Sequence, residues 1–260
     1  MLHYLVNFFY PPRCAACDVR LRTDAIQRLC AGCFARIDRM PTLVCEICGV
    51  PVATRRPDAA APDPAAADHT IEADEPQWCA NCVSSPPHFT RARAVVRYGH
   101  RADDDDREVV PSILRRHKYG LDQSLAHALA ECLGDELPLG NADYDLVIPV
   151  PLHRSRLIWR GFNQSAMLAV AVARRIGRPL DLSTLVRVRP TPPQTLQNRV
   201  ERVKNLKRAF AVRRPLRVAS RRILLIDDVM TTGTTADECA RTLIVAGARR
   251  VDVLTLARAI

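Results

Sequence analysis

Four Cys-x-x-Cys pairs lie in the first third of the 260-residue chain and constrain its fold more than any other feature. Each pair can place two thiolates about one tetrahedral Zn²⁺, at Zn–S distances of about 2.3 Å, so eight cysteines fill two Cys₄ sites. A thioredoxin-like redox motif would need one reactive pair beside a βαβ unit, whereas these pairs lie in proline-rich, non-periodic sequence. We therefore predict two structural zinc ions, bound by Cys14, Cys17, Cys30, Cys33, Cys45, Cys48, Cys79 and Cys82.

The order of the cysteine pairs leaves two arrangements of the zinc ligands open. Sequential pairing joins the first two pairs on one ion and the last two on the other, and crossed pairing mixes them. In either arrangement four thiolates leave no coordination position for water, so each ion folds the segment and has no catalytic role. Cys132 and Cys239 stand singly in predicted helices and are expected to be small buried residues.

Two further segments of the N-terminal region have unusual composition. Residues 1–10 are apolar but lack the basic flank and cleavage site of a signal peptide, which predicts a short apolar helix in a cytoplasmic protein. Residues 52–77 are rich in alanine, proline and acids, which predicts a disordered insertion. Since no uncharged apolar run approaches the ~18 residues that span a bilayer, membrane insertion is not expected.

Positive charge is concentrated in one part of the chain. The formal net charge is +10, and residues 151–222 carry 18 Lys and Arg against two acids, Asp181 and Glu201. Such a block favours an anionic partner, a nucleic acid or a polyphosphate, although arginines also serve solubility. Because the chain has two tryptophans and few other aromatic residues, contacts to a nucleic-acid backbone should dominate over base stacking.

Apolar runs alternate with helical periods from about residue 88 to the C-terminus. Strands that alternate with helices at this spacing are typical of a mostly parallel sheet. The predicted strands are 92–98, 145–150, 185–188, 223–226 and 251–256, and the predicted helices are 109–117, 123–137, 163–176 and 234–246.

The sharpest site pattern is the apolar run 223–226, which is followed by Asp227 and Asp228. Ligands of such sheets bind at the carboxyl ends of the strands. Backbone N–H groups and hydroxyls at a helix N-terminus suit a phosphate monoester, and two preceding carboxylates suit the ribose hydroxyls of a sugar phosphate. The loop lacks the lysine of a Walker A motif, and the alternative is a pair of surface acids before an ordinary helix cap. The cradle residues would be Thr231, Thr232, Gly233, Thr234 and Thr235.

This loop resembles the signature of type I phosphoribosyltransferases, whose ligand is 5-phosphoribosyl-1-pyrophosphate (PRPP). Other parts of the sequence narrow the match to the ComF/ComFC family of competence-associated, phosphoribosyltransferase-like proteins, which the chain resembles over nearly its whole length. These parts are the four cysteine pairs, Lys118-Tyr119-Gly120, Pro149-Val150-Pro151-Leu152, the run RGFNQ from Arg160 to Gln164, Gln194, Arg202 with Asn205, and Ala209-Phe210.

The resemblance implies an α/β fold: a type I phosphoribosyltransferase-like parallel sheet with helices on both faces, preceded by a small zinc-ribbon domain. The zinc-ribbon domain would cover residues 1–87 and the phosphoribosyltransferase-like domain residues 88–260. Mg²⁺ would bind together with PRPP. The structural alternative for Pro149–Pro151 is a rigid exit from a strand, and for Arg160 and Asn163 it is a helix start capped by asparagine. The resemblance implies a pyrophosphate loop of Val150, Pro151 and Leu152, and pyrophosphate or DNA contacts from Arg154, Arg156, Arg160, Asn163 and Gln164.

The function implied by this resemblance is binding of Mg-PRPP and single-stranded DNA during natural competence, DNA uptake or DNA utilisation. A DNA-uptake helicase or other competence proteins would be the protein partners. The alternative is a true phosphoribosyltransferase of nucleotide metabolism, purine or amidophosphoribosyltransferase-like, with no DNA role. No catalytic residue is assigned, because such transfer relies on positioning and on neutralising the leaving pyrophosphate.

Overall fold

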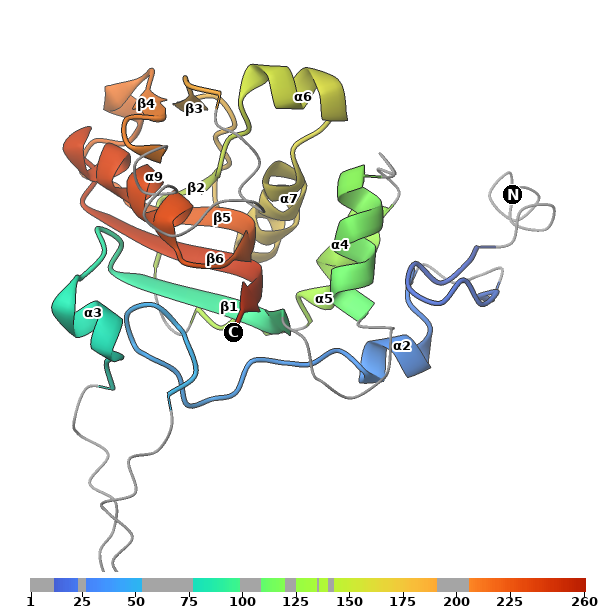
Figure 1. The fold of residues 1–260 in the computed structure, drawn as a ribbon. Coiled ribbons are helices and arrows are strands. Elements are labelled where there is room, and N and C mark those ends of the chain that lie inside the picture. The colour runs from blue at the N-terminus through green and yellow to red at the C-terminus, as the bar shows by residue number, and fades with distance from the viewer. Residues whose placement is uncertain are drawn as a thin grey trace, which may run out of the picture.

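A four-stranded parallel sheet forms the centre of the molecule, with the strand order β1-β6-β5-β2 (Figure 1). The computed structural model describes residues 12–22, 27–52, 77–98, 109–119, 125–134, 136–139, 143–190 and 206–260. The sheet strands are β1 (Arg91–Tyr98), β2 (Leu146–Pro149), β5 (Arg222–Met230) and β6 (Arg250–Ala259), and β3 (Leu185–Arg187) pairs antiparallel with β4 (Phe210–Val212).

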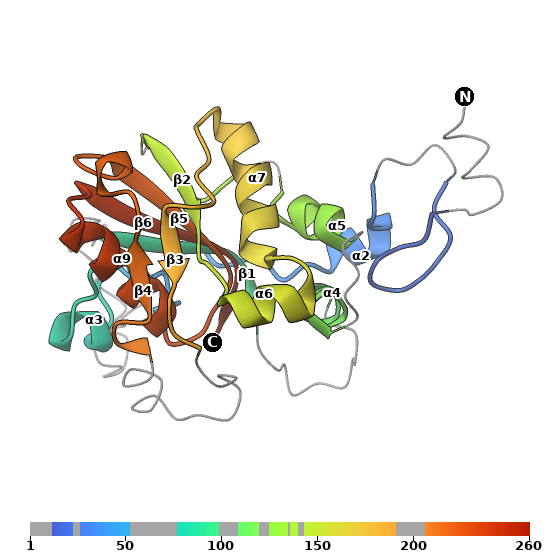
Figure 2. The ribbon, with the colours of Figure 1, turned by 90° about the horizontal axis from the view of Figure 1, so that it is seen from above.

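Helices cover both faces of the sheet, which confirms the predicted fold class. Figure 2 shows α7, α5 and α4 on one side of the sheet and α9 on the other. No helix within the described ranges is long and apolar enough to cross a membrane. The helices are α2 (Ala31–Ala35), α3 (Ala80–Ser84), α4 (Val109–Tyr119), α5 (Leu125–Cys132), α6 (Arg154–Arg160), α7 (Gln164–Ile176), the 3₁₀ turn η2 (Pro215–Arg217) and α9 (Thr234–Val245).

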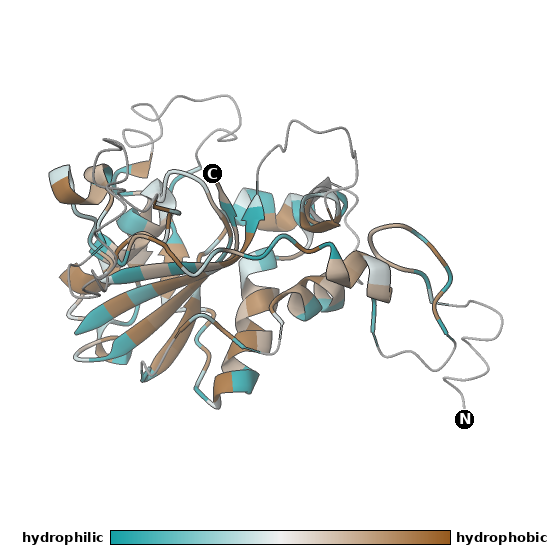
Figure 3. Ribbon diagram, turned by 90° about the horizontal axis from the view of Figure 1, so that it is seen from below, coloured by the Kyte–Doolittle hydropathy of each residue, from teal (hydrophilic) through white to brown (hydrophobic). Residues whose placement is uncertain are grey.

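The apolar run of β5 serves two hydrophobic cores, one on each face. Leu224 and Ile226 belong to the core beneath α4, α5 and α7, whereas Ile223 and Leu225 belong to the core beneath α9. Because successive side chains of a strand point to opposite faces, a strand covered on both sides is apolar without interruption. Figure 3 shows this apolar band along the strands.

The ends of two helices show how the sequence sets their length. Asn163 caps α7 by accepting a hydrogen bond from the Ser165 N–H, and Gly177 ends it with φ 63°, as predicted for residues 163–176. The helix predicted over residues 123–137 is shorter, since α5 ends at Cys132. Gly134 then has φ 71°, a left-handed conformation that cannot continue a helix.

Several expectations need correction or fall outside the described residues. The strand predicted at 223–226 continues to Met230, because its pairing with β6 extends from Asp227 opposite Thr255 to the end of the strand. Helix α6 and strand β4 were not predicted at all. The apolar segment 1–10, the insertion at 53–76, Gln194, Arg202 and Asn205 lie outside the described residues.

Segments outside the sheet pair with both of its outer strands. Residues 38–47 follow β1 in the antiparallel direction, with hydrogen bonds from Arg97 N–H to Asp38 O (2.8 Å), Met40 N–H to Val95 O (3.0 Å) and Ala92 N–H to Ile47 O (2.6 Å). On the other edge, the N–H of Val147 donates to Pro179 O at 2.9 Å. The segment along β1 connects the two cysteine clusters, which lie toward opposite ends of the molecule near α2 and α3 (Figure 1).

Candidate functional site

A cavity of about 540 Å³ opens at the carboxyl edge of the sheet. Its walls come from the end of β5, the loop into α9, the exit of β2, α6, the start of α7, and β3. This is the edge where parallel α/β sheets bind their ligands. The lining residues are Tyr98, Val150, Pro151, Leu152, Arg156, Trp159, Arg160, Gln164, Ser165, Arg187, Asp227, Asp228, Val229, Met230, Thr231, Thr232, Gly233, Thr234, Thr235 and Ala236.

The two carboxylates at the end of β5 are held by short hydrogen bonds. Ser165, in the first turn of α7, donates its hydroxyl to Asp227 Oδ1 at 2.8 Å, and the Asp228 N–H donates to the same oxygen at 2.9 Å. The Val229 N–H donates to Asp228 Oδ1 at 2.7 Å. Bonds of this kind to carboxylates are short and strong, so the acids are oriented before any ligand arrives.

The segment from Thr231 to Thr235 contains the loop after β5 and the first two residues of α9, whose N-cap is Gly233. Gly233 has φ 81°, and a Cβ at this position would lie 2.7 Å from Cε of Met230, so only glycine fits without displacement. The hydroxyls of Thr232 and Thr234 are 2.8 Å apart. The loop therefore presents hydroxyls and the N-terminal N–H groups of α9 together, a suitable cradle for a phosphate.

The β2 exit and α6 form a further part of the cavity wall. Val150, Pro151 and Leu152 line it, and so do Arg156, Arg160 and Gln164. Arg160 Nη1 donates to Gln164 Oε1 at 3.2 Å. The structure therefore brings most of the residues named from the sequence to one cavity.

Two of the named residues do not line the cavity. Arg154 begins α6 and is exposed. Asn163 uses its amide within the fold, since Nδ2 donates to Val150 O at 3.0 Å and Oδ1 accepts from the Ser165 N–H at 3.1 Å. Asn163 thus fastens the β2 exit to the start of α7.

Arg187 is a cavity residue that sequence reasoning missed. It lies on β3, is only 9% exposed, and stacks on Phe210 with its Cζ 5.5 Å from the ring centroid. Burial and the nearby Arg156 guanidinium lower the pKa of Arg187, whereas the carboxylate of Asp227 raises it. Arg187 shares the inward face of β3 with Leu185, but a strand of three residues is too short for its alternation to show this in the sequence.

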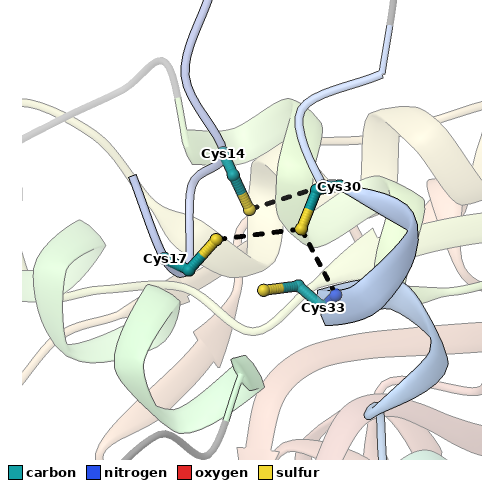
Figure 4. Close-up of side chains that lie close together, drawn as sticks. All are labelled: Cys14, Cys17, Cys30 and Cys33. Carbon is teal, nitrogen blue, oxygen red and sulfur yellow. Dashed lines mark hydrogen bonds between the residues drawn. The ribbon is translucent and has the colours of Figure 1, made fainter. Parts of the chain in front are cut away.

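The first cysteine cluster has the geometry of a metal cage. The four sulfur atoms of Cys14, Cys17, Cys30 and Cys33 point toward one another (Figure 4) and lie within 4.8 Å of each other. The Sγ atoms of Cys17 and Cys30 are 3.7 Å apart. Zn–S bonds of about 2.3 Å in a tetrahedron require S···S distances of about 3.8 Å, so these residues fit zinc.

The second cluster repeats this geometry with Cys45, Cys48, Cys79 and Cys82. Sγ of Cys48 and Sγ of Cys79 are 3.6 Å apart. A backbone N–H to sulfur bond recurs too, from Cys30 to Cys14 Sγ at 3.4 Å and from Cys79 to Cys45 Sγ at 3.3 Å. The ligand arrangement is therefore sequential, which decides between the two pairings that the sequence left open.

The first cysteine of each cage is prepared to be a thiolate. Burial raises the pKa of Cys14, but backbone N–H groups of Cys17, Cys30 and Ala16 lower it more, to about 7. Cys45 behaves in the same way, with a pKa of about 7. A bound Zn²⁺ would hold all four ligands of each cage as thiolates.

The first ribbon, residues 12–22 and 27–37, docks on α4 and α5 through buried apolar side chains and through hydrogen bonds. Glu131 of α5 accepts the N–H groups of Arg28 at 2.6 Å and Leu29 at 3.1 Å. Arg116 of α4 donates to Ala15 O at 2.6 Å, and Arg39, which follows the ribbon, donates to Cys132 O at 2.6 Å. Burial raises the pKa of Glu131, and the two N–H bonds oppose that shift.

The second ribbon, residues 43–52 and 77–84, docks on the sheet itself. Arg93 of β1 donates to Glu46 O at 2.8 Å and to Cys45 O at 3.4 Å. Arg258 of β6 is 6% exposed, and its Nε and Nη1 have no hydrogen-bond partner in the described part of the chain. Burial lowers the pKa of Arg258, whereas the thiolates of the second cage raise it. A buried cation beside four sulfurs fits a zinc–thiolate centre, whose net charge is negative.

Two family models match the chain, one over the cysteine-rich N-terminal part and one over the C-terminal part that contains the cavity loop. The double zinc ribbon domain matches residues 5–83, and the phosphoribosyl transferase domain matches residues 163–260. Among solved structures, adenine phosphoribosyltransferase from Thermoanaerobacter pseudethanolicus is 15% identical, with a TM-score of 0.34 over 53% of this chain and 82% of that chain.

Two curated relatives match most of the chain. "DNA utilization protein YhgH" of Salmonella typhimurium is 30% identical over 235 residues, which is 88% of this chain and 90% of the relative. "Competence protein F" of Haemophilus influenzae is 29% identical over 98% of this chain and the full length of the relative. With its two tetracysteine cages and its phosphoribosyltransferase-like sheet, the chain belongs to the ComF/ComFC family of competence and DNA-utilisation proteins.

Proposed function

We propose that the carboxyl-edge cavity binds Mg-PRPP and that the protein uses this site while it handles single-stranded DNA in competence or DNA utilisation. The observation that carries the proposal is the meeting of two oriented carboxylates, a threonine-glycine phosphate cradle and three arginines at one cavity. Relatives named for competence and DNA utilisation support the cellular role. Eight thiols kept for metal binding favour a reducing compartment, the cytoplasm.

Each wall of the cavity would hold one part of the ligand. Asp227 and Asp228 would accept the ribose hydroxyls, and the loop before α9 would receive the 5-phosphate. Arg156, Arg160 and Arg187 would face the pyrophosphate, whose charge a bound Mg²⁺ would help to neutralise. A substrate held between oppositely charged walls is oriented along its length, which is the main requirement of phosphoribosyl transfer.

Calorimetric titration with PRPP, with and without Mg²⁺, tests the sugar-phosphate site. In the double variant Asp227→Asn/Asp228→Asn, each lost charge-assisted hydrogen bond should cost about 1.5–3 kcal/mol. Asp143→Asn is a matched control, because Asp143 is exposed and precedes β2 at the opposite edge of the sheet. Unchanged PRPP affinity in a folded double variant would show that these acids are only surface groups.

Fluorescence polarisation with short oligonucleotides tests the DNA role. If about four cations contact phosphates, a plot of log K against log[salt] should have a slope of about −3. The triple variant Arg154→Glu/Arg156→Glu/Arg160→Glu should bind all DNA sequences more weakly, and by the same factor. Arg249→Glu is the control, because Arg249 is exposed at the amino end of β6. If the protein does not bind DNA at low salt, the DNA part of the proposal is wrong and only the proposed PRPP site remains.

The alternative, a true phosphoribosyltransferase of purine or amidophosphoribosyltransferase type, draws support from the family model over residues 163–260. It predicts release of pyrophosphate when PRPP is mixed with a nucleobase or ammonia. A screen of such acceptors with a pyrophosphate assay separates it from the DNA role. Turnover together with absent DNA binding would favour the alternative.

A further inference from the structure

Helix α6 contributes no buried residue, although its sequence is partly apolar. A helix usually buries an apolar stripe against the core, and α6 does not. Its position is fixed from both ends, by the His153 N-cap and by Gly161, which ends the helix with φ 77°. A bridge between His153 and Arg187 also ties its start to β3. The helix is thus a fixed surface element beside the cavity.

One face of α6 lines the cavity and carries an indole between two cations. Arg156, Trp159 and Arg160 are spaced at i, i+3 and i+4, so they share a face, and all three line the cavity. Trp159 is nevertheless 62% exposed, and Cζ of Arg160 is 6.0 Å from its ring centroid. The neighbouring Ile158 is 71% exposed but does not line the cavity.

We propose that Trp159 is the stacking surface for an unpaired base of single-stranded DNA at the mouth of the cavity. The inference rests on the proposed function and deepens it, since it assigns the base contact of the same site. Every base offers a flat π-face to an exposed indole, and adjacent arginines suit the linking phosphates. This adds one base contact to the backbone contacts that are expected to dominate.

Charge complementarity favours a DNA strand over a free base as the occupant. Residues 151–180 contain six arginines and no acid. Arg154 lies on α6 outside the cavity lining, so positive charge extends beyond the pocket. A free base has no phosphate to use that charge, whereas a strand that continues past the stacked base does.

The test uses the full-length zinc-loaded protein and the fact that it has two tryptophans. Trp78 lies beside Cys79 of the second ribbon and is 51% exposed, so Trp78→Phe leaves Trp159 as the single indole emitter. The probes are oligo(dT) and an abasic oligonucleotide of equal length and charge. We expect oligo(dT) to quench the Trp159 emission and the abasic strand to leave it unchanged.

Affinities provide the second readout. Trp159→Ala should weaken oligo(dT) binding about tenfold without changing the salt slope, and should not affect abasic binding. Ile158→Ala, which alters a neighbouring and even more exposed residue of the same helix, should leave both affinities unchanged.

Three results would overturn the inference. Wild-type DNA binding that Trp159→Ala does not weaken leaves the proposed function intact and removes the stacking role. If free nucleobases quench Trp159 and the protein binds no DNA, Trp159 contacts the nucleobase acceptor of a phosphoribosyl transfer. The DNA role in the proposed function is then wrong as well. A dimer that dissociates on Trp159→Ser identifies a second copy of the chain as the occupant.

Discussion

The two zinc ribbons have the same cage but different attachments. Both repeat one backbone N–H to sulfur bond and nearly equal S···S distances. The first ribbon packs buried residues such as Leu29 and Ile37 into the core beneath α4 and α5 and is hydrogen-bonded to Glu131, whereas the second is hydrogen-bonded to β1 and lies over the buried Arg258. Cysteine spacing therefore determines the geometry of each cage. The surface beneath a cage determines how much the protein is destabilised when that cage loses its metal.

Removing the second metal should have the largest effect on stability. Cys45→Ser removes one of the four ligands, and once the zinc is lost the remaining cysteines can protonate, which leaves Arg258 buried without compensating negative charge at a cost of about 3–5 kcal/mol. For a chain of this size we expect the main calorimetric transition to fall by about 10 °C. Cys14→Ser is the matched variant in the first cage and should lower that transition less. Equal losses in the two variants, each with one zinc per chain, would break the comparison.

Arg258→Met should loosen only the second zinc. Methionine fills the buried space but removes the positive charge that faces the cage, and outer-shell changes of this kind cost about 10–100-fold in metal affinity. Transfer of zinc to a coloured chelator should then show one accelerated phase. The first cage serves as the internal control, and two accelerated phases or none would refute the role given to Arg258.

Glu131→Gln should have the smallest effect and a local one. Arg28 and Leu29 donate to different oxygens of Glu131, so the amide, which has one acceptor oxygen, loses one of the two hydrogen bonds and weakens the other, at a cost of about 2 kcal/mol. Hydrogen exchange at these two amides should accelerate, while exchange in β5 stays unchanged. Faster exchange throughout the sheet would mean that the first ribbon is as deeply coupled as the second.

The pH dependence of the Glu131 contact has a definite sign. Because burial raises the pKa of Glu131, the folded protein holds this proton more tightly than the unfolded chain does. Its contribution to stability is complete below the usual glutamate pKa of about 4.3 and declines as the pH rises through the folded value. The stability advantage of wild type over Glu131→Gln should therefore shrink across weakly acidic pH.

Local patterns in the sequence predicted the Cys-x-x-Cys pairs, the strand before Asp227 and the limits of α7, because each depends on neighbours a few residues away. The way the pairs combine into two cages was left open, since it joins residues as distant as Cys48 and Cys79. The place of Arg187 in the cavity was not predicted, because a strand of three residues shows too little alternation to reveal which face points inward. The position of Trp159 on a helix was not predicted, because α6 lacks the apolar stripe by which a helix is recognised in a sequence. The pairing of residues 38–47 with β1 joins segments about 50 residues apart, and no local pattern reports such a contact.

That pairing gives zinc a second role. The segment between Cys33 and Cys45 shields the backbone of β1 while a metal cage anchors it on either side. An uncovered strand edge is a template on which another chain can add its own strand. For a protein that loses its metals, the first expected damage is therefore polymerisation through β1, before the cavity at the carboxyl edge is affected. Metal supply would then govern how long the protein stays dispersed as well as how well it folds.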